Sequence, residues 1–282
     1  MQITKYDFKY PQYPDLLREI PSPPKQLYVL GELPTTPCVA IVGTRKPTSY
    51  GKEVTYMLAG QLAAAGLTIV SGLAYGLDAV AHQGALDAGG QTVAVLAGGV
   101  ERVYPAGHRG LAEQIVAHHG ALISEDDGAK SIHKGSFVAR NRIVAGLSLA
   151  VIVTEANASS GSALTANYAL QQNRMLMAVP GNITNLTSAG PNNLIKSGAI
   201  PVTCSEDVLN ALNYTTTNAL ATAVPKSIDE ALILSLLGEG HTSSEALIKA
   251  SDLSASQFAN VITLMEITGK VRNLGAGQWV AR

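Results

Sequence analysis

Short apolar runs alternate with amphipathic stretches along most of the chain. From residue 38 onward, seven runs rich in Val, Ile, Leu and Ala are each followed by a stretch whose apolar residues recur at helical spacing. The runs are CVAIVG, LTIVSG, QTVAVLAGG, ALIS, LAVIVTEA, MLMAVPG and AIPVT. Because they are apolar throughout, they are typical of strands that are covered on both faces. The pattern predicts an α/β fold with a doubly wound, mostly parallel sheet.

The amphipathic stretches predict the helices that connect these strands. Their spacing places helices over residues 50–65, 77–88, 107–119, 137–147, 162–172 and 205–212, with one more short helix before the last strand. Residues 38–212 therefore predict one domain of extended Rossmann-like type.

The first 37 residues have a different composition. They contain two Tyr-Pro steps and a Pro-Ser-Pro-Pro run before a short apolar stretch at 27–30, and we interpret them as an extended lead-in that wraps the core. The polar start has no apolar signal segment, and no later run approaches the roughly 18 apolar residues that span a bilayer. We therefore expect a cytoplasmic protein without a membrane segment.

The chain beyond the last predicted strand has a second unit. Residues 213–226 are rich in Thr and Ala and predict a linker. Three short amphipathic helices follow, over 229–237 and from Thr242 and Ser254, and the last two begin with sequences that resemble capping boxes. The tail GKVRNLGAGQWVAR alternates like a hairpin, so residues 227–282 predict a small winged-helix domain. From residue 226 onward five cations oppose six acids, which favours protein interaction or regulation over direct DNA binding.

The net charge of −1 argues against a polyanionic partner, but the charges are unevenly distributed. Between residues 128 and 205 there are six cations and a single acid, Glu155, a net charge of +5. The cations are Lys130, Lys134, Arg140, Arg142, Arg174 and Lys196. This stretch predicts a basic surface on a protein of nearly neutral charge.

Cys38 and Cys204 lie far apart without ligand-like spacing, so we expect reduced cysteines and neither a disulfide nor a metal.

The first strand-to-helix junction, AIVGTRKPTSYGKEV, has the components of an anion site. Gly43 permits close approach of the backbone, Thr44 and the amides of the next helix offer donors, and Arg45 adds a charged fork. The junction lacks both GxGxxG and GxxxxGK[ST], so we expect no nucleotide cofactor. The alternative is an ordinary βα turn with a solvated Arg45.

Three more loops should meet at the same edge of the sheet. Ser71 and Gly72 follow the second strand, Ser162 follows the fifth, and Gly181 follows the sixth. Glu155 is an exception in this basic region, and it must be paired, turned away or catalytic. Asp78 and His82 are four residues apart on a predicted helix, where a structural hydrogen bond is favoured over acid/base catalysis.

The stretch HKGSFVARNRIVAGLS combines cations with one aromatic ring. Lys134, Arg140 and Arg142 provide charge for a nucleic-acid backbone, Phe137 provides a plane for a base, and Asn141 lies on the same face as Phe137 if the helix begins near residue 136. These are the components of a groove for a single strand. The alternative is a solvated helix whose Phe137 lies in the core.

The order of these motifs resembles the DNA-processing protein A (DprA/Smf) family over about residues 13–212. The matching segments are VGTR, SGLAYGLDAVAHQGAL, AVLAGGVERVYPAGHRGLAEQI, SFVARNRIVAGLS, VTEANASSGSALTANYAL, AVPGNITN and GPNNLIKSGAIPV. The resemblance implies a homodimer that grips single-stranded DNA in a basic pocket, protects incoming DNA in natural transformation, and helps to load the recombinase RecA.

The resemblance also implies the site residues. The loop arginine of the family matches Arg45, and the basic and aromatic pocket residues match Lys134, Phe137, Arg140, Asn141 and Arg142. The loops lining the pocket match Gly43, Thr44, Ser71, Gly72, Ser162 and Gly181. Val138 stands where the family often has Pro, and Asn173 where it often has Gly. Many members also carry an N-terminal helical domain of sterile-alpha-motif type, for which the 37 residues before the core leave no room.

We therefore expect a single-stranded-DNA-binding protein that is not an enzyme. The alternative is a nucleotide phosphoribohydrolase of the lysine-decarboxylase-like Rossmann group, which would use a carboxylate such as Glu155. That group resembles a PGGxGTxxE pattern, whereas the corresponding region here, ASSGSALTA, has no acid. A third hypothesis is a winged-helix transcription regulator with a nucleotide sensor. The DNA-binding hypothesis requires Arg45 and Lys134 to lie on the same side of the molecule.

Overall fold

The computed structural model describes residues 2–129, 131–158, 160–214, 227–267, 270–275 and 277–281. The chain divides into two compact units, Met1–Asn218 and Ala219–Arg282. The linker predicted over 213–226 lies outside the described residues, apart from Asn213 and Tyr214.

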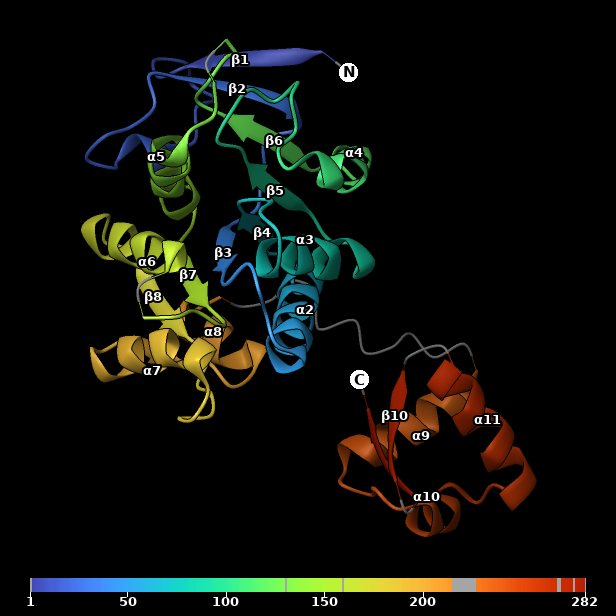
Figure 1. The fold of residues 1–282 in the computed structure, drawn as a ribbon. Helices are drawn as coiled ribbons and strands as arrows, with labels where there is room; N and C mark the ends of the chain where they lie inside the picture. Colours follow the sequence, from blue (N-terminus) through green and yellow to red (C-terminus); the bar gives the residue numbers. More distant parts are fainter. Residues whose placement is uncertain are drawn as a thin grey trace. The chain divides into compact units, whose positions relative to one another are not determined.

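The first unit is built on a nine-stranded sheet with the order β1-β2-β6-β5-β4-β3-β7-β8-β9 (Figure 1). The strands are β1 (Ile3–Asp7), β2 (Gln26–Gly31), β3 (Cys38–Val42), β4 (Thr68–Ser71), β5 (Thr92–Val95), β6 (Ala121–Ser124), β7 (Ala150–Val153), β8 (Met175–Ala178) and β9 (Ile200–Pro201). From β6 to β9 every neighbouring pair is parallel. The seven predicted strands are β3 to β9, and the predicted extended Rossmann-like, doubly wound fold is confirmed.

Helices cover both faces of this sheet (Figure 1). They are α1 (Asp15–Arg18), α2 (Ser49–Ala64), α3 (Leu77–Asp87), α4 (Arg109–Ala117), α5 (Lys134–Gly146), α6 (Gly161–Gln171), α7 (Ala189–Lys196) and α8 (Ser205–Ala211), with short 3-10 turns at Ala106–His108 and Leu186–Ser188. α5 and α6 pack on one face, and α2 and α3 pack on the other. Because the helices return antiparallel to the strands, the N-termini of α2, α3 and α5 all lie at the carboxyl edge of the sheet.

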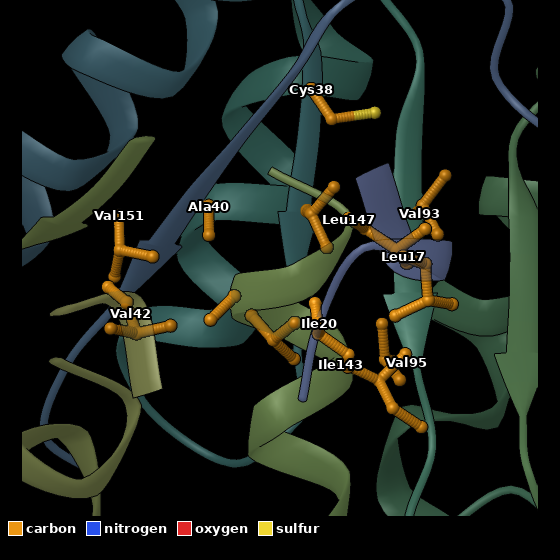
Figure 2. Packing of buried hydrophobic residues seen from close by; sticks show 14 of the residues in the cluster. Leu17, Ile20, Cys38, Ala40, Val42, Val93, Val95, Ile143, Leu147 and Val151 are labelled. Carbon is orange, nitrogen blue, oxygen red and sulfur yellow. The ribbon is translucent and has the colours of Figure 1, made fainter. Parts of the chain in front are cut away.

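The N-terminal segment differs from the predicted lead-in, because it extends the sheet instead of only wrapping it. β1 pairs antiparallel with β2, and β2 pairs antiparallel with β6. Leu17 of α1 and Ile20 are buried against Ile143 and Leu147 at α5, as Figure 2 shows. Burying an apolar side chain of this kind contributes roughly 1.5–3 kcal/mol to the stability of the fold. The N-terminal segment therefore helps to hold α5 against the sheet.

The second unit contains three helices and a hairpin around their own core. Its elements are α9 (Ile228–Gly238), α10 (Ser244–Ser251), α11 (Ala255–Ile267), β10 (Val271–Gly275) and β11 (Gln278–Ala281). Ser254 and Gln257 form the predicted capping box at α11, whereas α10 is capped by the Ser243 hydroxyl instead of Thr242. Among the described residues, no helix combines the length and apolar character needed to cross a membrane.

Candidate functional site

Hydrogen bonds join the loop after β3 to the loops after β4 and β7 at the carboxyl edge of the sheet. The Thr44 amide donates to the Glu155 carbonyl (2.7 Å), and the Leu77 amide donates to the Thr44 carbonyl (3.2 Å). Gly76 has a φ of +86°, and a Cβ there would collide with the Thr44 carbonyl and with the Arg45 backbone. Only glycine adopts this conformation at so close an approach without strain. These hydrogen bonds place Arg45 at the rim of the sheet.

A pocket of about 380 Å³ lies beside this rim, between the loops after β3 and β4, α5 and the start of α6. Eight of the predicted site residues line it: Gly43, Thr44, Arg45, Gly72, Phe137, Arg140, Asn141 and Ser162. The structure therefore brings together most of the set that the sequence pointed to.

Arg45 and Phe137 form the mouth of the pocket. The Arg45 guanidinium carbon lies 5.4 Å from the centre of the Phe137 ring, a cation–π contact. Arg45 is exposed, and in the described part of the chain it forms no ion pair with a carboxylate. Phe137 is half-buried instead of lying in the core, so the alternative of a core phenylalanine is wrong. An exposed cation and a partly exposed aromatic ring therefore lie together at this pocket.

Lys134 is the first residue of α5, which begins three residues earlier than predicted. It is exposed and lies one turn before Phe137, so it shares a face of α5 with that ring. Since Arg45 stacks on the same ring, Arg45 and Lys134 lie on the same side of the molecule, as the DNA-binding hypothesis requires.

Arg140 also lines the pocket, but its guanidinium is buried and already bound. It donates to the carbonyls of Gly72 and Val95, and its Nε donates to the Asn141 amide oxygen (3.1 Å). A Cβ on Gly72 would overlap this guanidinium. Burial lowers the pKa of Arg140, and the charge of Asp78 opposes that effect. The contacts show Arg140 supporting the pocket wall.

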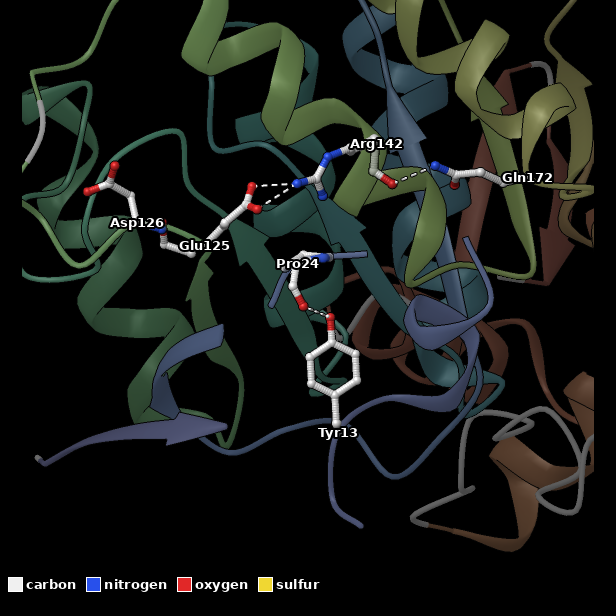
Figure 3. Close-up of polar contacts among 7 residues, drawn as sticks. Tyr13, Pro24, Glu125, Asp126, Arg142 and Gln172 are labelled. Carbon is white, nitrogen blue, oxygen red and sulfur yellow. Dashed lines mark hydrogen bonds and ion pairs between the residues drawn. The ribbon is translucent and has the colours of Figure 1, made fainter. Parts of the chain in front are cut away.

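Arg142 is not part of the lining of this pocket, and its guanidinium points toward Glu125 (Figure 3). Its Nη2 binds both carboxylate oxygens of Glu125, at 2.7 and 2.6 Å. Its carbonyl accepts from Gln172, and nearby the Tyr13 hydroxyl donates to the Pro24 carbonyl (Figure 3). Arg142 borders a separate, larger hollow with Glu125, and the structure does not bring it to the Arg45 site.

The predicted basic surface is correspondingly smaller than the sequence suggested. Arg174 pairs with Glu19 (3.5 Å), Arg142 pairs with Glu125, and Arg140 is buried. Lys130 lies outside the described residues. The exposed cations of this stretch that remain are Lys134 and Lys196, and Lys196 lies in the last turn of α7.

Two further predicted residues lie away from the pocket lining. Ser71 is fully buried, and its hydroxyl donates to the Ile41 carbonyl (2.7 Å). Gly181 lines a separate hollow with Tyr50 and Pro180.

Glu155 occupies the N-terminus of α2, where the sequence predicted free amides for a bound phosphate. Its Oε2 accepts from the Thr48 amide (2.9 Å), and its Oε1 accepts from the hydroxyls of Thr48 (2.6 Å) and Thr187 (3.1 Å). A negative charge at a helix N-terminus is favourable. That part of the predicted anion site was wrong, because the protein's own buried carboxylate fills it. Glu155 is paired, which was one of the three options for it.

Asp78 and His82 do not bind each other. The Asp78 carboxylate accepts from the Gly72 (3.2 Å) and Ala74 (3.3 Å) amides and fixes the β4–α3 loop. His82 contacts the Thr92 hydroxyl through Nδ1 (2.7 Å), and burial lowers its pKa to about 3. Both groups are structural, as the sequence favoured. Within the described residues, no cluster of three or more His, Cys, Asp or Glu side chains could hold a metal ion.

Aromatic residues that the sequence pattern did not predict lie beside the pocket. The Tyr104 ring lies 5.7 Å from that of Phe137, and the Tyr75 ring lies 4.8 Å from the His108 imidazole. Tyr75 and Tyr104 stand next to Gly76 and Pro105 in loops that follow strands β4 and β5. That placement was the only available signal, because loop tyrosines have no periodicity.

The fold and the site define a class: a doubly wound α/β protein with a cation–aromatic pocket at the carboxyl edge of its sheet, followed by a winged-helix unit. The chain belongs to the DNA recombination-mediator protein A family, which is the DprA/Smf family. Residues 4–213 match that family, and residues 217–277 match the DprA winged helix domain.

Relatives and solved structures agree with this assignment. The chain is 44% identical to protein Smf of Synechocystis sp. over 72% of its length and 52% of the relative's, and 40% identical to DNA processing protein DprA of Bacillus subtilis over 71% and 68%. It therefore spans about half the length of the Synechocystis protein. Two solved structures are similar to this one. DprA of Streptococcus pneumoniae matches with 37% identity and a TM-score of 0.70 over 74% of both chains. DprA of Helicobacter pylori matches with 33% identity and a TM-score of 0.67 over 76% of this chain and 96% of the other. The Helicobacter structure is described in terms of a single-stranded-DNA binding mode.

Proposed function

We propose that this protein binds single-stranded DNA at the pocket between the β3–α2 loop and α5. The observation that carries the proposal is the exposed Arg45 guanidinium stacked on the half-exposed Phe137 ring. A cation attracts the phosphate backbone, and an aromatic face accepts a base without reading its identity. Lys134, one turn away, adds a second charge on the same face of α5. The single-strand binding named for the Helicobacter relative supports the same function.

The pocket suits one strand better than a duplex. Phe137 lies at the mouth of a recess, and a base can reach it only when it is unpaired. Thr44 and Ser162 line the recess, and their hydroxyls can donate to phosphate oxygens.

The hydrolase alternative has less support. It needs a free carboxylate, and the one it would use, Glu155, is buried and bound to Thr48 and Thr187. We propose that the protein is a binding protein and not an enzyme. A titration with nucleoside monophosphate, followed for release of the free base, tests this directly.

The test of the DNA site is an oligonucleotide titration in graded salt. Arg45→Ala and Lys134→Ala should each weaken binding about tenfold at low salt, because each removes one charge-assisted contact. Each should also lower the slope of log affinity against log salt by about 0.7, the value for one phosphate contact on a single strand.

Lys196→Ala is the matched control. It removes one exposed lysine from the last turn of α7, which ends at the amino edge of the sheet, opposite the pocket. Its affinity and slope should equal those of the unmodified protein. If all three variants bind with the affinity of the unmodified protein, the DNA site lies elsewhere.

The finer role that we propose is DNA processing in natural transformation in the cytoplasm, where a homodimer protects incoming DNA and helps to load RecA. Membership of the DprA/Smf family supports this role. It is tested by the mass of the protein in solution, by nuclease digestion of the bound strand, and by the rate at which RecA filaments form on that strand.

A further inference from the structure

Two tyrosines beside the pocket are exposed in a way that needs an explanation. Tyr104 and Tyr75 are 55% and 54% exposed, although tyrosine rings are large and mostly apolar. Both follow strands of the parallel sheet, so they lie at the same edge as Arg45. Their positions are therefore part of the surface around the proposed DNA site.

The rings continue the contact between Arg45 and Phe137 outward. Arg45 lies over Phe137, and the Tyr104 ring lies 5.7 Å from Phe137 at an angle of 56°. Tyr104 is not part of the pocket lining, so it is an aromatic surface beside the pocket and not within it. His108, four residues further along the same loop and turn, contacts the Tyr75 ring edge-on at 4.8 Å.

This second pair is held in place by the backbone. The His108 Nδ1 donates to the Leu73 carbonyl (2.8 Å), which fixes the imidazole against Tyr75. Gly107 lies close to the Tyr75 side chain, because a Cβ on Gly107 would be only 3.1 Å from the Tyr75 hydroxyl oxygen. The Leu77 amide, two residues after Tyr75, donates to the Thr44 carbonyl (3.2 Å) and so joins the Tyr75 loop to the Arg45 loop. Aromatic surfaces held rigidly in this way lose little entropy when they bind.

Two other exposed tyrosines, Tyr50 and Tyr56, have a structural reason for their position. The Tyr56 hydroxyl donates to Asp87 and the Tyr50 hydroxyl donates to the Pro180 carbonyl. Among the described residues, the hydroxyls of Tyr75 and Tyr104 have no such partner. Hydrogen bonding does not account for these two rings.

We propose that Tyr104 and Tyr75 are stacking surfaces for unpaired bases outside the pocket, and that His108 is a positioning residue for Tyr75. This inference rests on the proposed DNA binding at the Arg45 pocket and extends it by about two bases. The pocket provides cations for the phosphates, and the two tyrosines provide contacts that depend on the bases alone.

The test compares two fluorescent oligonucleotides of about twelve nucleotides, within the usual length of such sites. One is oligo-dT, and the other has the same sugar-phosphate backbone with abasic residues. Tyr104→Ala and Tyr75→Ala should each weaken binding of oligo-dT about tenfold, since one stacked base contributes roughly that much. They should leave binding of the abasic strand and the salt slope unchanged, and Tyr104→Phe should bind as the unmodified protein does.

His108→Ala should cause the same loss for oligo-dT as Tyr75→Ala, and the double variant should lose no more than either single variant. Tyr10→Ala is the matched control, because Tyr10 is equally exposed but lies in the N-terminal segment. Thermal melts of all variants check that the fold is retained.

The outcomes separate this inference from the proposed function. Suppose that Arg45→Ala weakens binding of both strands. If the tyrosine variants then bind both strands normally, or lose affinity for both strands equally, the proposed stacking surfaces are wrong and the proposed pocket is retained. If Arg45→Ala has no effect on the binding of either strand, the proposed DNA binding at the Arg45 pocket is itself wrong.

Discussion

At the scale of single residues, buried polar side chains determine the shape of the pocket rim. Asp78 holds the amides of the β4–α3 loop, and Arg140 holds two strand-end carbonyls. Burial raises the pKa of Asp78 and lowers that of Arg140, and each charge opposes the shift of the other. A buried charge left without its partner is costly, so we infer that these two groups stabilise each other and keep Gly72 beside the pocket.

His82 makes the stability of the protein depend on pH. Its pKa is about 3 in the folded protein because of burial, whereas an unfolded histidine has a pKa near 6.5. Between these values the unfolded chain binds one more proton, so the free energy of unfolding falls as the pH drops, by up to about 1.4 kcal/mol per pH unit. His82→Asn should remove this contribution.

The measurement is urea unfolding of both proteins from about pH 6.5 to about pH 4.5. The asparagine amide can still donate to the Thr92 hydroxyl. The two proteins can differ in their free energy of unfolding at any one pH, so the quantity to compare is the slope of that free energy against pH. Parallel curves for the two proteins would mean that His82 is protonated equally in both states.

At the scale of elements, helix α2 begins on a carboxylate from a distant part of the chain. Glu155 lies 107 residues after Thr48, and it binds the first turn of α2. Glu155→Gln removes the charge but keeps the size. We expect a loss of about 1–3 kcal/mol in the free energy of unfolding, because buried charge-assisted hydrogen bonds become neutral ones.

Denaturant unfolding at neutral pH measures this loss, and Glu113→Gln on exposed α4 should change stability by less than about 0.5 kcal/mol. Single-strand affinity should be retained, because Thr44 is held by the Glu155 carbonyl and not by its carboxylate. If the two variants have equal free energies of unfolding, the Glu155 carboxylate does not stabilise the start of α2.

The sequence predicted the central elements well, because buried parallel strands are apolar at every position. It did not predict β1 and β2 as strands of the sheet, because they lie among prolines and pair antiparallel at its edge. It placed the start of α5 too late, because the cap is the unusual His133 side chain, which accepts from the Gly135 amide.

The candidate site was predictable in part for a similar reason. Residues at the ends of parallel strands meet wherever the sheet is doubly wound, which is why Gly43, Arg45 and Gly72 could be grouped. The pairing of Arg142 with Glu125, and of Glu155 with Thr48, joins side chains that are far apart in the sequence. Charge counting treats such groups as free, and it therefore overestimated the basic surface.

At the scale of the whole molecule, the Arg45 pocket belongs to the first unit, and we expect the second unit to have a different task. The buried clusters of the first unit use residues only as far as Tyr214, so it has a core of its own. In the winged-helix unit, Lys270 is buried in an ion pair with Glu230, and α11 carries no lysine or arginine. The five cations of this unit oppose six acids, and we expect a unit without net positive charge to bind DNA weakly.

A protein that ends at Tyr214 should therefore bind single-stranded DNA as the full chain does. We expect an affinity within about twofold and the same salt slope, because the Arg45 pocket is intact and no phosphate contact is lost. Circular dichroism and a cooperative thermal melt establish that the shortened protein folds. A tenfold loss of affinity with a lower slope would place phosphate contacts in the second unit, and binding would then have to be shared between the two.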